Sequence, residues 1–241
     1  GASDGVRWFQ LYCFRDREIL RDLVERAEAS GYTALCVTVD VPLLGVRERD
    51  KRNRFGMPEG LSLKNLEQAG ADTMAQASSG SSLNQYVADQ FDPSLTWDLL
   101  EWLRGITSLP ILLKGILNAA DARLAVEHGV NGIIVSNHGG RQLDGAVTGC
   151  EALPAIVDAV GGATEILVDG GIRRGTDVLK AMAMGAQAVL IGKSYLWGLA
   201  VDGEAGVRNV LDMLRWELSS SMALAGRPNI ASIDRELIAG S

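Results

Sequence analysis

Short runs of apolar residues alternate along this chain with segments of helical periodicity, and this alternation is the feature that most limits its possible folds. Six such runs are present, at residues 8–14, 33–39, 110–113, 132–135, 166–168 and 188–191. The run TALCVTV at 33–39 does not alternate between apolar and polar residues, which is typical of a strand buried on both faces. The sequence therefore predicts an α/β protein built from parallel βα units.

Helical segments follow the predicted strands. We expect them at residues 16–27, 95–103, 119–128, 152–160 and 176–184, and over most of 207–225. The stretch 41–94 breaks the rhythm because it is first charged and marked by glycine and proline, and then small and polar. A stretch this long inside a compact domain is usually a functional lid, a binding loop or a disordered segment.

Nearly every predicted strand ends in a polar or charged residue. Parallel barrels build their sites at this carboxyl-terminal face of the strands. A doubly wound open sheet is the competing fold, but no glycine-rich dinucleotide fingerprint follows the first strand, so a closed ring is favoured. The residues at the strand ends are Gln10, Tyr12, Thr38, Asp40, Lys114, Ser136, His138, Arg141, Asp169, Gly171, Arg173, Gly192 and Lys193.

The run SNHGGRQLD from Ser136 to Asp144 is the densest group of chemically capable side chains. His138 can exchange a proton near neutral pH, and the guanidinium of Arg141 can hold a carboxylate in a two-pronged grip. The alternative is a simple turn in which Asn, Gly and Asp shape the backbone. We favour a site that binds an organic acid and performs proton chemistry on it, because the whole cluster follows a strand.

Two later loops predict a phosphate site. They are DGGIRRG at 169–175 and IGK at 191–193, and both join glycines to cationic side chains near a helix start. Either loop alone could be only a tight turn. Lys114 ends an apolar run, and three roles stay open for it: a stem packed in the core with its ammonium in solvent, a Schiff-base lysine, or a positive charge against a cofactor.

Composition excludes several classes of partner. The formal net charge is −7, which argues against nucleic acid or an anionic membrane as the main partner. The three cysteines are widely spaced and form neither a metal-ligand pattern nor a disulfide framework, so we expect reduced thiols and no metal site. The chain has no apolar run of the roughly 20 residues that span a bilayer, and no targeting signal is visible.

The motifs together resemble those of the FMN-dependent L-2-hydroxy acid oxidases and dehydrogenases, over essentially the whole chain. This resemblance implies a (β/α)8 TIM barrel with FMN across its mouth, and residues 1–241 would form one such domain with 41–94 as an active-site loop or lid. Family members carry two further strands before the FQLY motif, so this chain would supply six of the eight βα units. The motifs are FQLY, TVD with RERD and NRF, ILLKG, SNHGGRQLDG, ILVDGGIRRGTDVLKAMAMGA and IGK.

The resemblance also implies roles for the catalytic residues. His138 would be the active-site base and Asp40 its carboxylate partner. Arg141 would bind the substrate carboxylate, with Arg47 as a second, more mobile guanidinium. Tyr12 would hydrogen-bond the substrate hydroxyl or the carbonyl formed from it.

Further residues would bind the cofactor. Lys114 would lie against the N1/O2 edge of the flavin, and the phosphate would lie in the two glycine loops. Family members usually carry arginine at the position of Lys193, and lysine keeps the charge but loses the two-pronged geometry. The implied cofactor-binding residues are Gln10, Thr38, Lys114, Ser136, Asp169, Gly171, Arg173, Gly192 and Lys193.

The implied reaction is oxidation of a small L-2-hydroxy acid to the 2-oxo acid, with dioxygen or another electron acceptor reoxidising FMN. With dioxygen the second product is hydrogen peroxide. We expect a cytoplasmic or peroxisomal homo-oligomer, a tetramer by resemblance. Two alternatives stay open from the residues: a non-redox phosphate-binding barrel, such as an isomerase or aldolase, and an inactive fragment.

Overall fold

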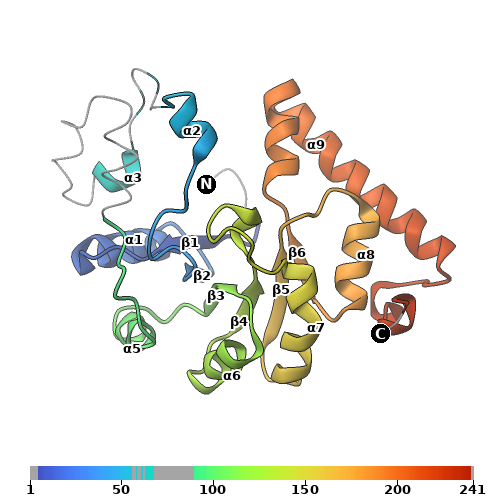
Figure 1. Ribbon diagram of the computed structural model, residues 1–241, viewed down its shortest axis with the longest axis horizontal. Helices are drawn as coiled ribbons and strands as arrows, with labels where there is room; N and C mark the ends of the chain where they lie inside the picture. The colour runs from blue at the N-terminus through green and yellow to red at the C-terminus, as the bar shows by residue number, and fades with distance from the viewer. Residues whose placement is uncertain (1–4, 56–57, 59–60, 62, 68–89, 240–241) are drawn as a thin grey trace. The chain divides into compact units, whose positions relative to one another are not determined.

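A computed structural model describes residues 5–55, 58, 61, 63–67 and 90–239 (Figure 1). The chain divides into two compact units, Gly1–Lys114 and Gly115–Ser241. Both units contain parallel strands joined by helices, and the single domain over residues 1–241 stays a prediction.

The first unit is built on parallel strands. Their bounds are Trp8–Tyr12 for β1, Ala34–Thr38 for β2 and Ile111–Ile116 for β3, which ends just beyond the unit boundary. In the register of this sheet, Tyr12 pairs with Thr38, and Thr38 pairs with Lys114. The carboxyl ends of β1 and β2 therefore lie level with Lys114, and β3 continues two residues further to Ile116. All three strands lie at runs that the sequence predicts.

Helix α1 covers β1, as Figure 1 shows. It begins where the Asp16 side chain accepts a hydrogen bond from the backbone N–H of Glu18, and it buries an apolar stripe that includes Leu20 and Val24. The helices of this unit are α1 (Arg17–Ala29), α2 (Glu48–Arg52), α3 (Lys64–Glu67) and α5 (Asp98–Arg104). Within the predicted loop 41–94 the short helices α2 and α3 interrupt the chain, and residues 68–89 lie outside the described residues.

The second unit repeats the βα pattern. Its strands β4 (Gly132–Val135), β5 (Glu165–Asp169) and β6 (Ala188–Leu190) are parallel, with Val135 opposite Val168 and Asp169 opposite Leu190. Its α-helices are α6 (Ala119–Glu127), α7 (Gly149–Val160), α8 (Gly175–Ala183) and α9 (Lys193–Leu224). Single 3-10 turns are η2 (His138–Gly140), η3 (Ile230–Ser232) and η4 (Arg235–Leu237). All three strands were predicted, whereas α9 starts earlier than expected.

Helix α9 consists of two pieces that meet at a break. Asp202 and Gly203 leave the helical conformation, and Gly203 has a φ of 52° that favours glycine. The piece before the break starts directly after β6, and the piece after it packs against α8 (Figure 1). The sequence predicted only the second piece, because the first has apolar residues on several sides and no clear stripe.

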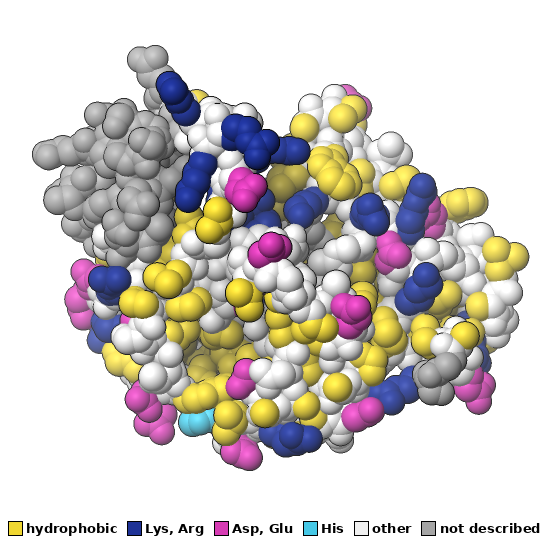
Figure 2. Space-filling view, in the orientation of Figure 1, with side chains coloured by type: hydrophobic (Ala, Val, Ile, Leu, Met, Phe, Trp, Pro, Cys, Tyr) yellow, Lys and Arg dark blue, Asp and Glu magenta, His cyan; other side chains and the backbone are white. Residues whose placement is uncertain are grey.

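Apolar side chains remain exposed on the second unit. Along α9 the exposed residues include Trp197, Val201 and Trp216, and hydrophobic side chains are visible over this helix in Figure 2. Strand β6 is only partly buried, whereas β4 is buried throughout. Among the described residues, no helix has both the length and the apolarity needed to cross a bilayer.

Candidate active site

In the first unit, polar side chains gather where the three strands end. The Gln10 side chain donates from Nε2 to the Thr38 hydroxyl at 3.1 Å and to the Tyr12 hydroxyl at 3.4 Å. Thr38 is buried, and the register places it between Tyr12 and Lys114. The structure therefore brings together four of the predicted residues of this unit.

Lys114 lies inside β3, two residues before its end, and is only 5% exposed. Its backbone carbonyl accepts a hydrogen bond from the N–H of Val39 at 2.9 Å, which holds the chain after β2 beside it. Burial of this extent argues against an ammonium that reaches bulk solvent. A buried cation is favourable only beside electron-rich groups, so the site suits a negatively polarised ligand edge.

Asp40 and Arg47 belong to the chain that follows β2. Both are half-buried, and Arg47 precedes the first residue of α2. His138, the predicted partner of Asp40, belongs to the second unit. The pairing of these two side chains therefore stays a prediction.

In the second unit, the loop after β4 has an unusual backbone. His138 has a φ of 58°, and Gly139 and Gly140 follow with 64° and 70°. The buried Ser136 hydroxyl accepts from the N–H of His138 at 3.0 Å, and the Asn137 side chain accepts from the N–H of Gly140 at 3.1 Å. A left-handed histidine is uncommon, and such strain tends to occur at functional sites.

Arg141 and its neighbours complete this loop. Arg141 ends the η2 turn three residues after His138, and its side chain is exposed and so accessible to a ligand. The Asn137 side chain donates to the carbonyl of Val147 at 3.3 Å, which ties the start of the loop to its end. The loop thus presents an imidazole and a guanidinium from one short, internally bonded segment.

The predicted phosphate loops meet the His138 loop. Lys193 donates from Nζ to the carbonyl of Gly139 at 3.1 Å. A methyl group placed on Gly170 would lie 3.7 Å from Oδ1 of Asn137, so the loop after β5 is also in contact. Ser194 is buried and donates to the carbonyl of Ile172 at 2.9 Å. Three consecutive loops of this unit are therefore neighbours.

The start of α8 is already occupied by carboxylates. Asp177 accepts from the N–H groups of Arg173 and Arg174 at 3.0 and 2.9 Å, and Glu217 accepts from the N–H of Gly175 at 2.8 Å. The hydrogen bond from Gly175 and that from Arg174 lower the pKa of Glu217. These N–H groups at the start of α8 therefore already donate to carboxylates of the chain itself. The expected contribution of this helix start to anion binding is correspondingly smaller.

Other groups of the phosphate loops suit an anion. Gly171 has a φ of 78°, and within the described part of the chain no heavy atom lies within 4 Å of the position that a Cβ of Gly171 or Gly192 would occupy. Both backbones are therefore open to close approach by a ligand. The side chains of Arg173 and Lys193 are exposed and bring positive charge.

Each unit has donor groups that suit one part of FMN. A phosphate needs open backbone N–H groups and cations, which the loops after β5 and β6 provide. A flavin edge needs hydrogen-bond donors and a positive charge, which Gln10, Thr38 and Lys114 provide in the other unit. Asp169 ends β5 and is half-buried, where its carboxylate can accept from ligand hydroxyls.

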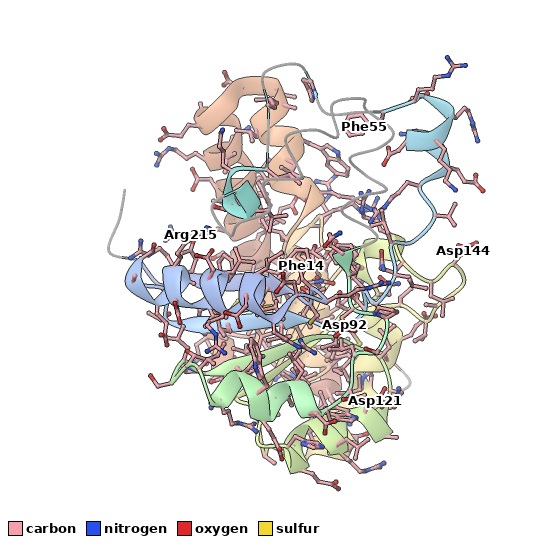
Figure 3. The ribbon with its side chains drawn as sticks, turned by 90° about the vertical axis from the view of Figure 1, so that its left-hand side faces the viewer. Phe14, Phe55, Asp92, Asp121, Asp144 and Arg215 are labelled. Atoms are coloured by element: carbon pink, nitrogen blue, oxygen red, sulfur yellow. The ribbon has the colours of Figure 1, made fainter. Side chains whose placement is uncertain are left out.

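Sequence reasoning missed several residues that shape these clusters. Glu217 lies 42 residues after Gly175, and no local pattern indicates that they meet. Phe91 packs against Tyr12. Asp92, which is labelled in Figure 3, pairs with Arg17 at the start of α1. The motif Asp92-Pro93-Ser94 is a recognisable turn signal, but the burial of Asp92 is not visible in the sequence.

Solved structures with similar folds define the class of protein. A mandelate oxidase with (S)-4-hydroxymandelic acid matches with a TM-score of 0.87 and 48% identity, over 95% of this chain and 64% of that chain. A second structure of mandelate oxidase matches with a TM-score of 0.83 and 48% identity, over 95% of this chain and 62% of that chain. The chain thus belongs to the class of (β/α)8 barrel proteins and supplies six βα units of that fold.

Curated relatives agree with this class. L-lactate oxidase from Nostoc sp. is 55% identical over 98% of this chain and 65% of its own length. The 2-hydroxyacid oxidase 1 of Mus musculus is 52% identical over 98% of this chain and 65% of its own length. Glycolate oxidase 3 of Oryza sativa subsp. indica is 53% identical over 97% of this chain and 64% of its own length. The chain therefore spans about 65% of these relatives.

A family model described as FMN-dependent dehydrogenase matches residues 1–240. The chain belongs to this family. The resemblance and the FMN cofactor predicted from the sequence are thereby confirmed, whereas the roles of individual residues stay predictions.

Proposed function

We propose that this chain carries the active site of an FMN-dependent oxidase that converts a small L-2-hydroxy acid to the 2-oxo acid. The observation that carries the proposal is the loop after β4, which presents a left-handed His138 and, three residues later, an accessible Arg141. The relatives named lactate, glycolate and mandelate oxidases support it.

Substrate binding falls to the guanidinium groups. Arg141 holds the substrate carboxylate in a charge-assisted, two-pronged hydrogen bond, and Arg47 adds a second cation from the loop after β2. Fixing the carboxylate orients the α-carbon and its hydroxyl toward the acid-base group. Tyr12 hydrogen-bonds that hydroxyl, or the carbonyl formed from it.

Proton transfer falls to His138. Its imidazole accepts a proton from the substrate, and positive charge grows on it in the transition state. The carboxylate of Asp40 stabilises that charge and orients the ring. The accepted proton comes from the α-carbon in a carbanion route and from the hydroxyl in a hydride route, and both routes use the same two residues.

Cofactor binding is divided between the clusters. FMN supplies the two-electron acceptor for the oxidation when it is bound. Gln10, Thr38 and Ser136 would contact the ring system or ribityl chain of FMN, and Lys114 would stabilise negative charge on the flavin edge. The ribityl hydroxyls and the phosphate are bound by Asp169, Gly171, Arg173, Gly192 and Lys193.

The acceptor and the assembly are also part of the proposal. Dioxygen would be the electron acceptor, with hydrogen peroxide as the second product, and the names of the oxidase relatives support this choice. The protein assembles as a homotetramer and works in the cytoplasm or the peroxisome. These assignments rest on the resemblance.

The direct test is a visible absorption spectrum of the protein with FMN under anaerobic conditions. We expect one of glycolate, L-lactate or L-mandelate to bleach the flavin absorbance, because electrons then pass from the substrate to the cofactor. Production of hydrogen peroxide on readmission of air identifies the acceptor. A protein that binds FMN but is bleached by none of the three acids would contradict the proposed reaction, and a protein that binds no FMN would favour an inactive fragment.

The role of Arg141 predicts a separate result. Arg141→Lys should raise KM about tenfold or more and slow flavin reduction, because lysine keeps the charge but loses the planar fork. Steady-state kinetics with the acid that bleaches the flavin measures both effects. Arg123→Lys in α6 is a matched control, since Arg123 is exposed on that helix. Unchanged KM and kcat in the Arg141 variant would exclude the carboxylate role.

A further inference from the structure

Tyr12 packs against a residue from the far end of the long loop. Its ring stacks on Phe91 with centroids 5.8 Å apart and an interplanar angle of 28°. Phe14 also stacks on Phe91, at 5.7 Å and 26°. Phe91 and Phe14 are both buried, so the Tyr12 ring packs against a small, buried aromatic cluster.

The backbone around Phe91 is fastened to the chain that leaves β1. Arg15 donates its N–H to the carbonyl of Gln90 at 2.8 Å, and Asp92 donates its N–H to the carbonyl of Cys13 at 3.0 Å. The Arg15 side chain donates from Nε to the carbonyl of Phe91 at 3.0 Å. Residues 90–92 thus form an antiparallel clamp on residues 13–15, one residue beyond Tyr12.

A buried carboxylate holds this clamp in place. Asp92 is 5% exposed, accepts from the N–H and hydroxyl of Ser94 at 3.0 and 2.6 Å, and pairs with Arg17 at 3.0 Å. The guanidinium of Arg17 in turn lies 5.4 Å from the ring centre of Trp102 in α5. The Ser94 hydroxyl contributes most to lowering the pKa of Asp92, with Arg17 contributing further. Figure 3 labels Phe14 and Asp92, which mark the two sides of the clamp.

We propose that Phe91, held by the Asp92 clamp, is a positioning residue that fixes the ring of Tyr12 for substrate binding. The inference rests on the proposed function, which makes Tyr12 a substrate-binding residue. Tyr12 lies at the end of a strand and is half-buried, so packing on one face of its ring limits rotation about its side-chain bonds. A hydroxyl that is fixed before the substrate arrives binds it without first losing that freedom.

The clamp also determines where the long loop ends. Residues 90–92 close the stretch 41–94 that the sequence predicts as a lid or binding loop. Residues 90–92 are hydrogen-bonded to the chain next to Tyr12. A displacement of these residues would therefore move Phe91 and, with it, the substrate-binding hydroxyl of Tyr12. The contact between Tyr12 and Phe91 therefore links the end of β1 to the end of the stretch 41–94.

The kinetic test compares two substitutions of similar packing cost. Phe91→Leu removes the ring that contacts Tyr12, whereas Phe14→Leu removes the other ring of the stack. We expect KM for the substrate that bleaches the flavin to rise about fivefold in Phe91→Leu and to stay within about twofold in Phe14→Leu. Equal changes in KM in the two variants would overturn the proposal, because general loss of packing would then explain both.

A double-mutant cycle ties the effect to the Tyr12 hydroxyl. In a Tyr12→Phe background, Phe91→Leu should have little further effect on KM, because the hydroxyl that it positions is gone. A full additional effect would contradict the inference. If Phe91→Leu does not fold, Asp92→Asn serves in the same cycle, because it keeps the shape of the side chain while removing the charge that pairs with Arg17.

A spectroscopic readout separates this inference from the proposed reaction. The chain has four tyrosines, so incorporation of 3-fluorotyrosine gives few ¹⁹F signals, and Tyr12→Phe identifies the one from Tyr12. Phe91→Leu should shift that signal more than Phe14→Leu does. An unshifted Tyr12 signal would overturn the positioning role even if the enzyme is active. A shifted signal in a protein that oxidises none of the acids would retain the contact and reject the proposed function.

Discussion

His138→Gln is expected to slow flavin reduction by the substrate by about 10²- to 10⁴-fold while leaving FMN bound. Glutamine can still form hydrogen bonds, but it cannot accept the proton that the imidazole takes in the transition state. The cofactor should remain bound, because Ser136 keeps its side chain and the other residues proposed to hold the cofactor lie outside this loop. Anaerobic stopped-flow measurement of flavin bleaching gives the rate, and the visible spectrum gives the bound FMN.

Two further variants make this result specific. His128→Gln changes the only other histidine, a half-buried residue that ends α6, and should leave the reduction rate within about twofold because His128 is not among the residues proposed for the site. His138→Asn tests the backbone, because asparagine tolerates the left-handed conformation better than most residues. Flavin reduction at the normal rate in either His138 variant would remove this residue from the mechanism.

Much of the fold could be predicted because its signals are local. The run Gly132–Val135 is apolar throughout and forms a strand with the same bounds. The Asp16 cap and the apolar spacing after it predict α1 within a few residues. A parallel βα arrangement then follows, and it brings the strand ends that carry Tyr12, Thr38 and Lys114 into register. The sequence thus predicts that these three side chains lie at the same height in the sheet.

The unpredicted features depend on contacts between distant residues. The left-handed φ of His138 results from hydrogen bonds around the loop, and a histidine gives no sign of it. Lys114 lies within β3 because the strand continues through Gly115, whose φ of 116° is open to glycine. Phe91 contacts Tyr12 although the two residues are far apart in the sequence, and hydrophobic periodicity reports only on residues close together in the sequence. Such contacts are fixed by tertiary packing, which local propensity does not encode.

Gly175→Ala is expected to be among the most destabilising single substitutions in the second unit. A Cβ at this position would lie 2.0 Å from the backbone N of Leu218 and 2.3 Å from the carbonyl carbon of Glu217. Both contacts are with the backbone of α9, so no side chain can rotate away, and the two helices would have to separate. Separation would also break the hydrogen bond from the Gly175 N–H to Glu217.

The expected loss is about 3 kcal/mol or more in the free energy of unfolding, since overpacking and a broken buried hydrogen bond act together. For a chain of this length that corresponds to a fall of about 6 °C or more in the melting temperature, measured by circular dichroism. Thr176→Ala is the matched control, because Thr176 is exposed at the next position of α8 and its loss should cost less than about 0.5 kcal/mol. If Gly175→Ala and the control have the same melting temperature, the backbones of α8 and α9 are not in contact at Gly175. The carboxylate of Glu217 would then be free of the start of α8, and the N–H of Gly175 would become available to the phosphate.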